Sequence, residues 1–313
     1  MFTVAISQLT MSRWELPAEV AHLADRGFDA ISIWRPKLSD MGLDESAAIL
    51  SRSGVRVSSL QWAGGFTGGD GRSFAESVSD AREAIDTAAA LGGRILIVHA
   101  GCRGGHTLSH ARRLLLQALE TLLPVAERAG VTLALKPFHA AADCSFLNRL
   151  REAADLVERF DAGSLRLSLD LWQFAHEQEV WSLADRLASL TAVVQAADRL
   201  GPPSSDQERI PVGHGTLPLE SLFAMLVEHG YEGDVEFDPV GEAVESLGYD
   251  RVLDEARLVA DGWKLALQAD MGPLQPVDAT AARLPDAIRS RTAQFRPAGV
   301  RRSHASSQIV SRG

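Results

Sequence analysis

The sequence lacks long hydrophobic runs, since nowhere do 18 apolar residues follow one another, and this argues against a membrane-spanning helix. The opening stretch MFTVAISQLT lacks the basic start and long apolar core of a secretion signal. Cysteine is scarce as well: Cys102 and Cys144 are the only two, and they do not have the spacing of a zinc site. We therefore expect a cytoplasmic protein from a reducing compartment, without a membrane partner.

Positive charge is also limited, and it is unevenly distributed. The formal net charge of -10 argues against a nucleic-acid partner, because phosphate binding needs a clustered basic face. Only three of the 31 basic residues are lysines, namely Lys37, Lys136 and Lys264. The segment from Met271 onward carries seven arginines and two aspartates among Pro, Ser, Ala and Gly. We predict a disordered tail there, with a partner-binding or subunit-bridging arm as the alternative.

Residues 1–269 alternate short apolar runs with longer amphipathic segments, which is typical of strands and helices around a parallel sheet. The predicted strands are 2–7, 29–34, 55–61, 94–101, 131–136, 165–170, 190–198 and 233–238. The predicted helices are 17–27, 44–54, 71–93, 107–129, 148–160, 179–187, 218–230 and 249–268. Eight such units predict an α/β fold, a (β/α)8 TIM barrel over 1–269 with the flexible tail at 270–313. A doubly wound open sheet competes, but no glycine-rich phosphate loop is present.

Polar side chains close the apolar runs of six successive predicted strands, where a TIM barrel has its active site. They are Gln61 with Trp62, His99, Lys136 with His139, Asp170 with Gln173, Gln195 with Asp198, and Glu236 with Asp238. Each alone has a plain structural explanation, such as capping a turn or pairing with an arginine. Because the barrel would bring them to one mouth, they predict a ligand-binding or catalytic site. Aromatic residues at the same ends, Trp172 above all, are candidates for its walls.

Five stretches carry a resemblance to a known family: IVHAG, LALKPFH, LSLDLWQF, VVQAADRLGPPSSDQERIPVGHG and YEGDVEFDPV, in this order. Through them residues 1–269 resemble the xylose isomerase-like TIM barrels, the superfamily of sugar isomerases and epimerases, inosose dehydratase and 3-dehydroshikimate dehydratase. The resemblance implies a divalent metal, commonly Mn²⁺, Mg²⁺ or Co²⁺, held by one side chain from each of strands five to eight. The corresponding positions here are Lys136, Asp170, Gln195 and Glu236.

The resemblance also implies substrate contacts, and three positions depart from the family pattern. We expect the substrate-contacting residues to be Arg209, Gln173, Trp172, Trp62 and His139. The departures are Lys136 where the family has Glu, Gln173 where it has His, and His214 where it usually has Glu. The architecture therefore matches better than the chemistry.

Lys136 changes the expected cofactor. An ammonium group has no lone pair to offer a metal, and exchanging a carboxylate for it changes the local charge by two units beside a dication. Asp170, Gln195 and Glu236 remain as oxygen donors, so we expect no cofactor or a weakly bound Mn²⁺ or Mg²⁺. We expect Lys136 to lie near the metal position, paired with Asp170 and Glu236, as a charged hydrogen-bond donor rather than a nucleophile.

Two hypotheses of function follow from these positions. The first is an isomerase, epimerase or dehydratase that transfers a proton next to a carbonyl of a polyhydroxylated small molecule, with Lys136, His99 and Glu236 as catalytic residues and Glu236 as the base. The second is a catalytically silent barrel that binds a small molecule or a partner protein. A conventional metalloenzyme with a displaced site, using His99, His139 or His176, stays open within the first hypothesis. The substrate, and whether the chain forms a homo-oligomer, are left open.

Overall fold

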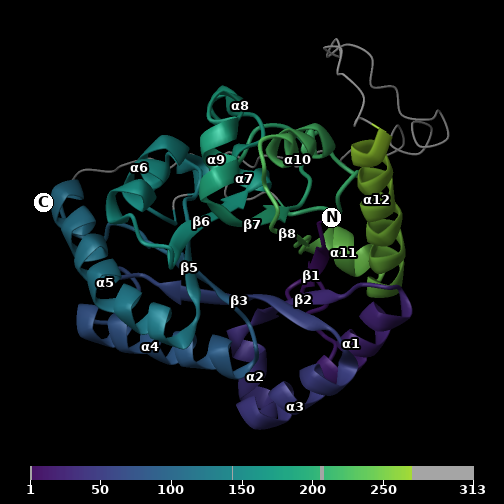
Figure 1. The fold of residues 1–313 in the computed structure, drawn as a ribbon, viewed down its shortest axis with the longest axis horizontal. Coiled ribbons are helices and arrows are strands. Elements are labelled where there is room, and N and C mark those ends of the chain that lie inside the picture. The colour runs from purple at the N-terminus through teal and green to yellow at the C-terminus, as the bar shows by residue number, and fades with distance from the viewer. Residues whose placement is uncertain (1, 143, 205–207, 270–313) are drawn as a thin grey trace, which may run out of the picture. The chain divides into compact units, whose positions relative to one another are not determined.

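Eight parallel strands close into a barrel in the computed structural model, which describes residues 2–142, 144–204 and 208–269 (Figure 1). The strands are β1 (Val4–Ser7), β2 (Ala30–Trp34), β3 (Arg56–Gly64), β4 (Ile95–His99), β5 (Thr132–Lys136), β6 (Leu165–Asp170), β7 (Thr191–Ala196) and β8 (Asp234–Phe237). Each strand pairs with the next, and β8 pairs with β1. The predicted TIM barrel is confirmed, while the predicted tail at 270–313 lies outside the described residues.

Helices follow the strands in chain order and surround the barrel (Figure 1). They are α1 (Leu16–Asp25), α2 (Arg35–Met41), α3 (Leu43–Ser53), α4 (Phe74–Ala90), α5 (Leu108–Ala129), α6 (Leu150–Phe160), α7 (Leu171–Phe174), α8 (Gln178–Ser182), α9 (Ala184–Leu190), α10 (Leu219–Glu228), α11 (Glu242–Leu247) and α12 (Tyr249–Ala269), with the 3-10 turn η1 (Ala140–Ala142). Local signals set their ends: Ser73 and Glu76 form a capping box on α4, and Gly130 ends α5 in a left-handed conformation.

The helix prediction was incomplete in the loops. The short helices α2, α7 and α11 were not predicted, and the predicted helix 179–187 is divided at Leu183 into α8 and α9. Helices of four to seven residues show too few turns for a clear hydrophobic period. Across the part of the chain that is described, no helix combines the length and apolar character needed to cross a membrane.

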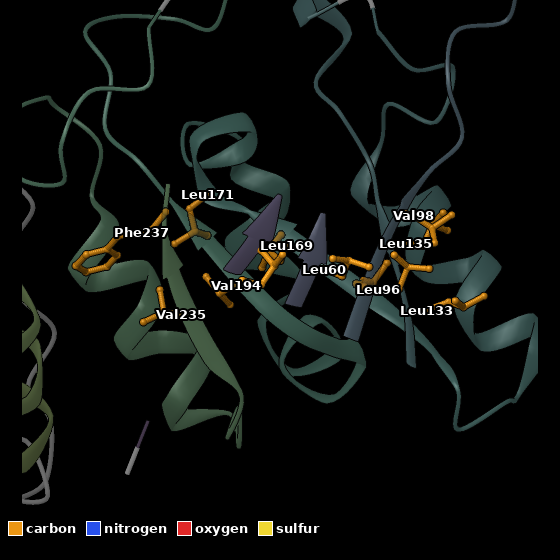
Figure 2. Close-up of a cluster of buried hydrophobic side chains, with 14 of the residues drawn as sticks. Leu60, Leu96, Val98, Leu133, Leu135, Leu169, Leu171, Val194, Val235 and Phe237 are labelled. Atoms are coloured by element: carbon orange, nitrogen blue, oxygen red, sulfur yellow. The ribbon is translucent and has the colours of Figure 1, made fainter. Parts of the chain in front are cut away.

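Alternate residues of each strand point to opposite faces of the barrel wall. One face is apolar and packs with the helices in a single large cluster (Figure 2). Its strand residues include Leu60, Leu96, Val98, Leu133, Leu135, Leu169, Val194, Val235 and Phe237. The other face encloses a small cluster of Ile97, Ala134 and Val193. Most of the polar strand residues lie on this inner face, so the strands present them to the barrel interior.

An irregularity in β3 shapes this interior. Ile31 pairs with Val57 and Ile33 with Leu60. The register therefore moves three residues along β3 for two residues along β2. Such a bulge breaks the alternation of side chains. As a result the hydroxyls of the consecutive residues Ser58 and Ser59 both reach across the barrel to β8.

Candidate active site at the carboxyl ends of the strands

A cavity of about 610 Å³ opens at the carboxyl ends of the strands. It is lined by six of the residues that were expected to be catalytic or to contact substrate, namely Trp62, His99, Lys136, Trp172, Gln173 and Arg209. Apolar walls come from Leu9, Ile97, Phe138 and Val240. A largely apolar cavity with a few convergent polar groups is typical of small-molecule sites.

The ammonium of Lys136 forms part of the floor of this cavity. Its Nζ lies 2.8 Å from Oδ2 of Asp170 and donates a hydrogen bond of 2.6 Å to Oε1 of Gln195. The side chain is 12% exposed, so the amine faces the cavity while these two partners are fully buried. An ammonium has three donors, and two of them are engaged by these contacts.

Arg209 is a second cation on the same carboxylate. Its guanidinium donates to both oxygens of Asp170, at 3.0 and 3.1 Å, and to the carboxylate of Asp238. Burial would raise the pKa of Asp170, but Arg209 and then Lys136 outweigh it and hold that pKa at about 2. The two carboxylates in turn raise the pKa of Arg209 against the opposing effect of its burial. Arg209 was predicted to contact substrate, yet much of its hydrogen-bonding capacity serves the protein.

Glu236 lies beneath the floor rather than in the cavity wall. It is fully buried, and its carboxylate accepts hydrogen bonds from Ser58 at 2.7 Å, Ser59 at 2.6 Å and Nε2 of Gln195 at 3.1 Å. Lys136 does not pair with Glu236 as expected. The amide of Gln195 lies between them and forms a hydrogen bond with each. Burial raises the pKa of Glu236 to about 7, although the three donors oppose this rise.

His99 stands beside Lys136, in register with it on the neighbouring strand. Burial, and then the charge of Lys136, lower the pKa of His99 to about 4, so its imidazole is neutral at pH 7. The ring contacts Trp62 and Phe138 edge to face, at centroid distances of 6.4 and 6.2 Å. Among the described residues its ring nitrogens have no hydrogen-bond partner, which leaves both of them available to a ligand.

Asp238 is a further titratable group in the cavity lining. It closes the β8 run and was named among the polar strand ends, but it was assigned no catalytic, substrate-binding or metal-binding role from the sequence. Burial raises the pKa of Asp238 to about 6, although Arg209 opposes this rise. Its position just after an apolar strand was the available signal. The role of base was assigned instead to Glu236, two residues earlier, because it matches a family metal-ligand position.

The remaining predicted residues take different positions. Trp172 is nearly buried, donates from its indole to the carbonyl of Glu208 at 3.2 Å, and stacks on Arg209 at 5.3 Å. Gln173 lines the cavity, and its amide oxygen accepts from the backbone of His139 at 3.0 Å. The ring of His139 lies 3.0 Å from Glu177 and is not among the cavity-lining residues.

Trp62, 44% exposed, forms part of the rim. Such an exposed indole offers an apolar face to whatever enters the cavity.

The donor set does not fit a divalent metal. Both oxygens of Asp170 face cations, and Oε1 of Gln195 accepts from Lys136. The oxygens of Glu236 already accept three hydrogen bonds. Divalent metals need several free oxygen or nitrogen donors around one point. The described part of the chain contains no group of three or more His, Cys, Asp or Glu residues able to hold a metal, and this includes any displaced site with His99, His139 or His176.

Comparison with known proteins gives a consistent family. Residues 20–251 match the family described as xylose isomerase-like TIM barrel. A Streptomyces coelicolor protein assigned as a hydroxypyruvate isomerase is 26% identical over 247 residues, covering 70% of this chain and 84% of the relative. An inosose isomerase of Halalkalibacterium halodurans is 24% identical over 239 residues, covering 73% of this chain and 84% of that protein.

Solved structures show the same fold. The crystal structure of a Sinorhizobium meliloti protein has a TM-score of 0.74 at 24% identity, covering 83% of this chain and 97% of its own. The 3-keto-D-glucoside 4-epimerase of E. coli has a TM-score of 0.68 at 19% identity, covering 82% and 100%. The IOLI protein, solved with a bound zinc atom, has a TM-score of 0.73 at 18% identity, covering 87% and 100%. At these identities the likeness establishes the fold.

Proposed function

The chain belongs to the xylose isomerase-like TIM barrel family, and from this premise we propose that it is an isomerase or epimerase that moves a proton next to the carbonyl of a small hydroxy-carbonyl compound, without a resident metal. The observation that carries the proposal is the ammonium of Lys136, which faces the cavity at the position where the resemblance implies a metal ligand. The curated relatives are named as isomerases of hydroxypyruvate and inosose, and we take these two compound types as the first candidate substrates.

Lys136 supplies the charge stabilisation that the reaction needs. Removing a proton from a carbon next to a carbonyl places negative charge on the carbonyl oxygen, and a fixed cation at that oxygen lowers the barrier. Two of the three donors of Lys136 are engaged by Asp170 and Gln195. The third is available to the substrate oxygen. The pair with Asp170 orients the ammonium, which favours this role over attack on the carbonyl.

His99 and Asp238 are the proposed proton-transfer groups. Both line the cavity, and they come from the ends of β4 and β8, on opposite sides of an eight-stranded barrel. With a pKa of about 6, Asp238 is ionised at pH 7 and can accept a carbon-bound proton. His99, neutral at that pH, exchanges a proton with a substrate hydroxyl. Return of the proton to the former carbonyl carbon gives an isomer. An epimer forms when Asp238 releases its proton to solvent and a solvent proton reaches the same carbon from the opposite face.

Glu236 is proposed as a positioning residue and not as the base. It touches no cavity surface, and it acts through Gln195, whose amide it holds so that the amide oxygen faces Lys136. Loss of a neighbouring hydroxyl from the same enolate would make the enzyme a dehydratase, which is the finer alternative within this proposal.

Deuterium exchange tests the proposal directly. The protein is incubated with hydroxypyruvate or an inosose in D₂O containing a chelator, and deuterium at the carbon next to the carbonyl is followed by NMR. We expect enzyme-dependent exchange that persists with the chelator and falls about 100-fold or more in Lys136→Met, because the oxyanion loses its cation. Lys264→Met is the matched control, since that lysine lies on α12 against Phe2.

A second candidate function is a silent barrel that binds a small molecule. The observation in its favour is that Lys136 and Arg209 between them neutralise Asp170, which satisfies the floor without any ligand. This candidate predicts saturable binding of a hydroxy-carbonyl compound without exchange. Exchange that stops with the chelator and returns with Mn²⁺ would instead contradict metal-free catalysis.

A further inference from the structure

A second cavity, of about 960 Å³, lies at the ends of β4 and β5 and is independent of the proposed function. The loop after β4, the start of α5, the loop after β5 and the start of α6 form its walls, together with Glu179 of α8. We name it the arginine groove after its four arginines, Arg103, Arg112, Arg149 and Arg151. Three carboxylates share the lining, namely Glu152, Asp155 and Glu179.

Each of these three carboxylates already has a cation. Glu152 lies 2.6 Å from Arg112, and Glu179 lies 3.3 Å from Arg151. Asp155 lies 2.6 Å from Arg186, which is not part of the lining. Among the described residues, these pairs leave no carboxylate of the lining to balance the other two arginines.

Arg103 and Arg149 are the uncompensated charges. Over the described residues, neither guanidinium has a hydrogen bond or an ion pair, although both line the same groove. The whole chain carries a formal net charge of -10, so two unpaired cations in one concavity have the opposite sign to the net charge of the protein. Two planar guanidinium groups match the oxygens of a phosphate group.

The groove also has an apolar part. Leu108 is 39% exposed and lines it, together with Phe146. A volume of about 960 Å³ is far larger than a bare phosphate ion needs, and exposed apolar surface in a concave site favours an organic body.

We propose that the arginine groove binds a phosphate monoester of a small organic molecule. Arg103 and Arg149 take the phosphate oxygens, and the organic part lies on Leu108 and Phe146. Nucleic acid does not suit this groove, because a duplex requires a basic surface extended over many phosphates.

The arginine groove shares a wall with the candidate active-site cavity. Ala142 and Cys144 line the cavity, and the next residues along the chain, Ser145 and Phe146, line the groove. At β4, the last strand residue His99 lines the cavity, and Cys102 in the loop that follows lines the groove. A ligand in the groove therefore contacts the loop after β5, which also lines the cavity.

Phenyl phosphate is the probe for this site, because it joins one phosphate to one apolar ring. Its binding to the full chain is measured by calorimetry and by the broadening of its ³¹P signal, beside inorganic phosphate and phenol. We expect saturable binding of phenyl phosphate that is at least about tenfold tighter than binding of either component alone, since it engages both parts of the groove.

Charge-reversal variants distinguish binding in the arginine groove from nonspecific electrostatic attraction of the phosphate to the protein. Arg103→Glu and Arg149→Glu together are expected to weaken phenyl phosphate binding more than about tenfold. Arg159→Glu, on an exposed arginine in the last turn of α6, changes the net charge in the same sense outside the groove and should weaken it less than about twofold. No binding to the wild type, equal affinity for inorganic phosphate, or an equal loss in Arg159→Glu would overturn the proposal.

Discussion

The two faces of the same barrel strands are built from different chemistry. On β5, the outward residues Leu133 and Leu135 belong to the large apolar cluster, while the inward residue Lys136 meets Asp170 and Gln195. The outer face is apolar, and packing with the helices supplies the hydrophobic stabilisation. The inner face carries ionisable groups whose burial costs free energy unless each is paired.

This contrast separates stability from chemistry within single strands. A barrel could fill its interior with aliphatic side chains and fold well, as Ile97, Ala134 and Val193 do at one level of this one. The polar layer around Lys136 adds no comparable hydrophobic stabilisation, so its value lies in what it presents to the cavity. Changes on the two faces should therefore have different consequences.

The largest expected effect is on the inner face. Asp170→Asn removes the carboxylate shared by Lys136 and Arg209, and two cations that are only 12% and 16% exposed then lose their common partner. We expect the free energy of unfolding to fall by about 3–5 kcal/mol, measured by urea denaturation. Asp155→Asn, which affects an exposed pair with Arg186, should cost less than about 1 kcal/mol. Equal effects of the two substitutions would mean that the inner pairing does not hold the site together.

The next effect is on the outer face. Leu135→Ala deletes a fully buried side chain of the apolar cluster and should cost about 3 kcal/mol. Its neighbour in the chain gives the matched comparison: Lys136→Met should cost about 1 kcal/mol, because Arg209 still compensates Asp170. A larger loss of stability in Lys136→Met than in Leu135→Ala would contradict the division between the two faces.

The pH dependence of the free energy of unfolding tests the inner face through Glu236. The pKa of Glu236 is raised from its ordinary 4.5 to about 7 in the folded protein, so the folded state holds a proton that the unfolded state has released. Its contribution to stability is present below pH 4.5 and is lost as pH rises through 7, on the order of 3 kcal/mol in total. Glu236→Gln should remove this part of the slope in urea unfolding measured from pH 4.5 to 8. An unchanged slope would show that Glu236 is not the group responsible.

The smallest stability effect is expected at the rim. Trp62→Ala replaces a side chain that is 44% exposed and should change the free energy of unfolding by less than about 1 kcal/mol. If the indole is a cavity wall, the same variant should weaken ligand binding at least about fivefold, measured by titration with the substrate identified by deuterium exchange. A loss of stability without a loss of binding would make Trp62 a packing residue.

The sequence was sufficient to predict the barrel and the level of the site. The eight apolar runs matched the eight strands to within a few residues, because buried parallel strands have a continuous apolar signal. Since parallel strands end at one mouth, the proximity of Lys136, Asp170 and Gln195 followed from their places at strand ends.

Depth within the barrel could not be read from the sequence. Whether Glu236 meets Lys136 or lies beneath Gln195 depends on strand register and on the bulge that turns Ser58 and Ser59 inward. Sequence alone does not specify a bulge between two serines. The buried pair of Glu19 and Lys37, beneath the loop after β1, was missed for a similar reason, because its partners come from separate short segments.

The central claim is that Lys136 stands at the position of a family metal ligand and that its positive charge acts in place of a metal ion. The most direct test is the metal content of the full chain, by mass spectrometry, after equilibration with Mn²⁺ and Zn²⁺ and extensive dialysis. The account predicts no stoichiometric metal in the wild type, because the oxygens of Asp170 and Gln195 are engaged by Lys136 and Arg209. Retention of about one metal ion per chain, lost in Asp170→Asn, would contradict it.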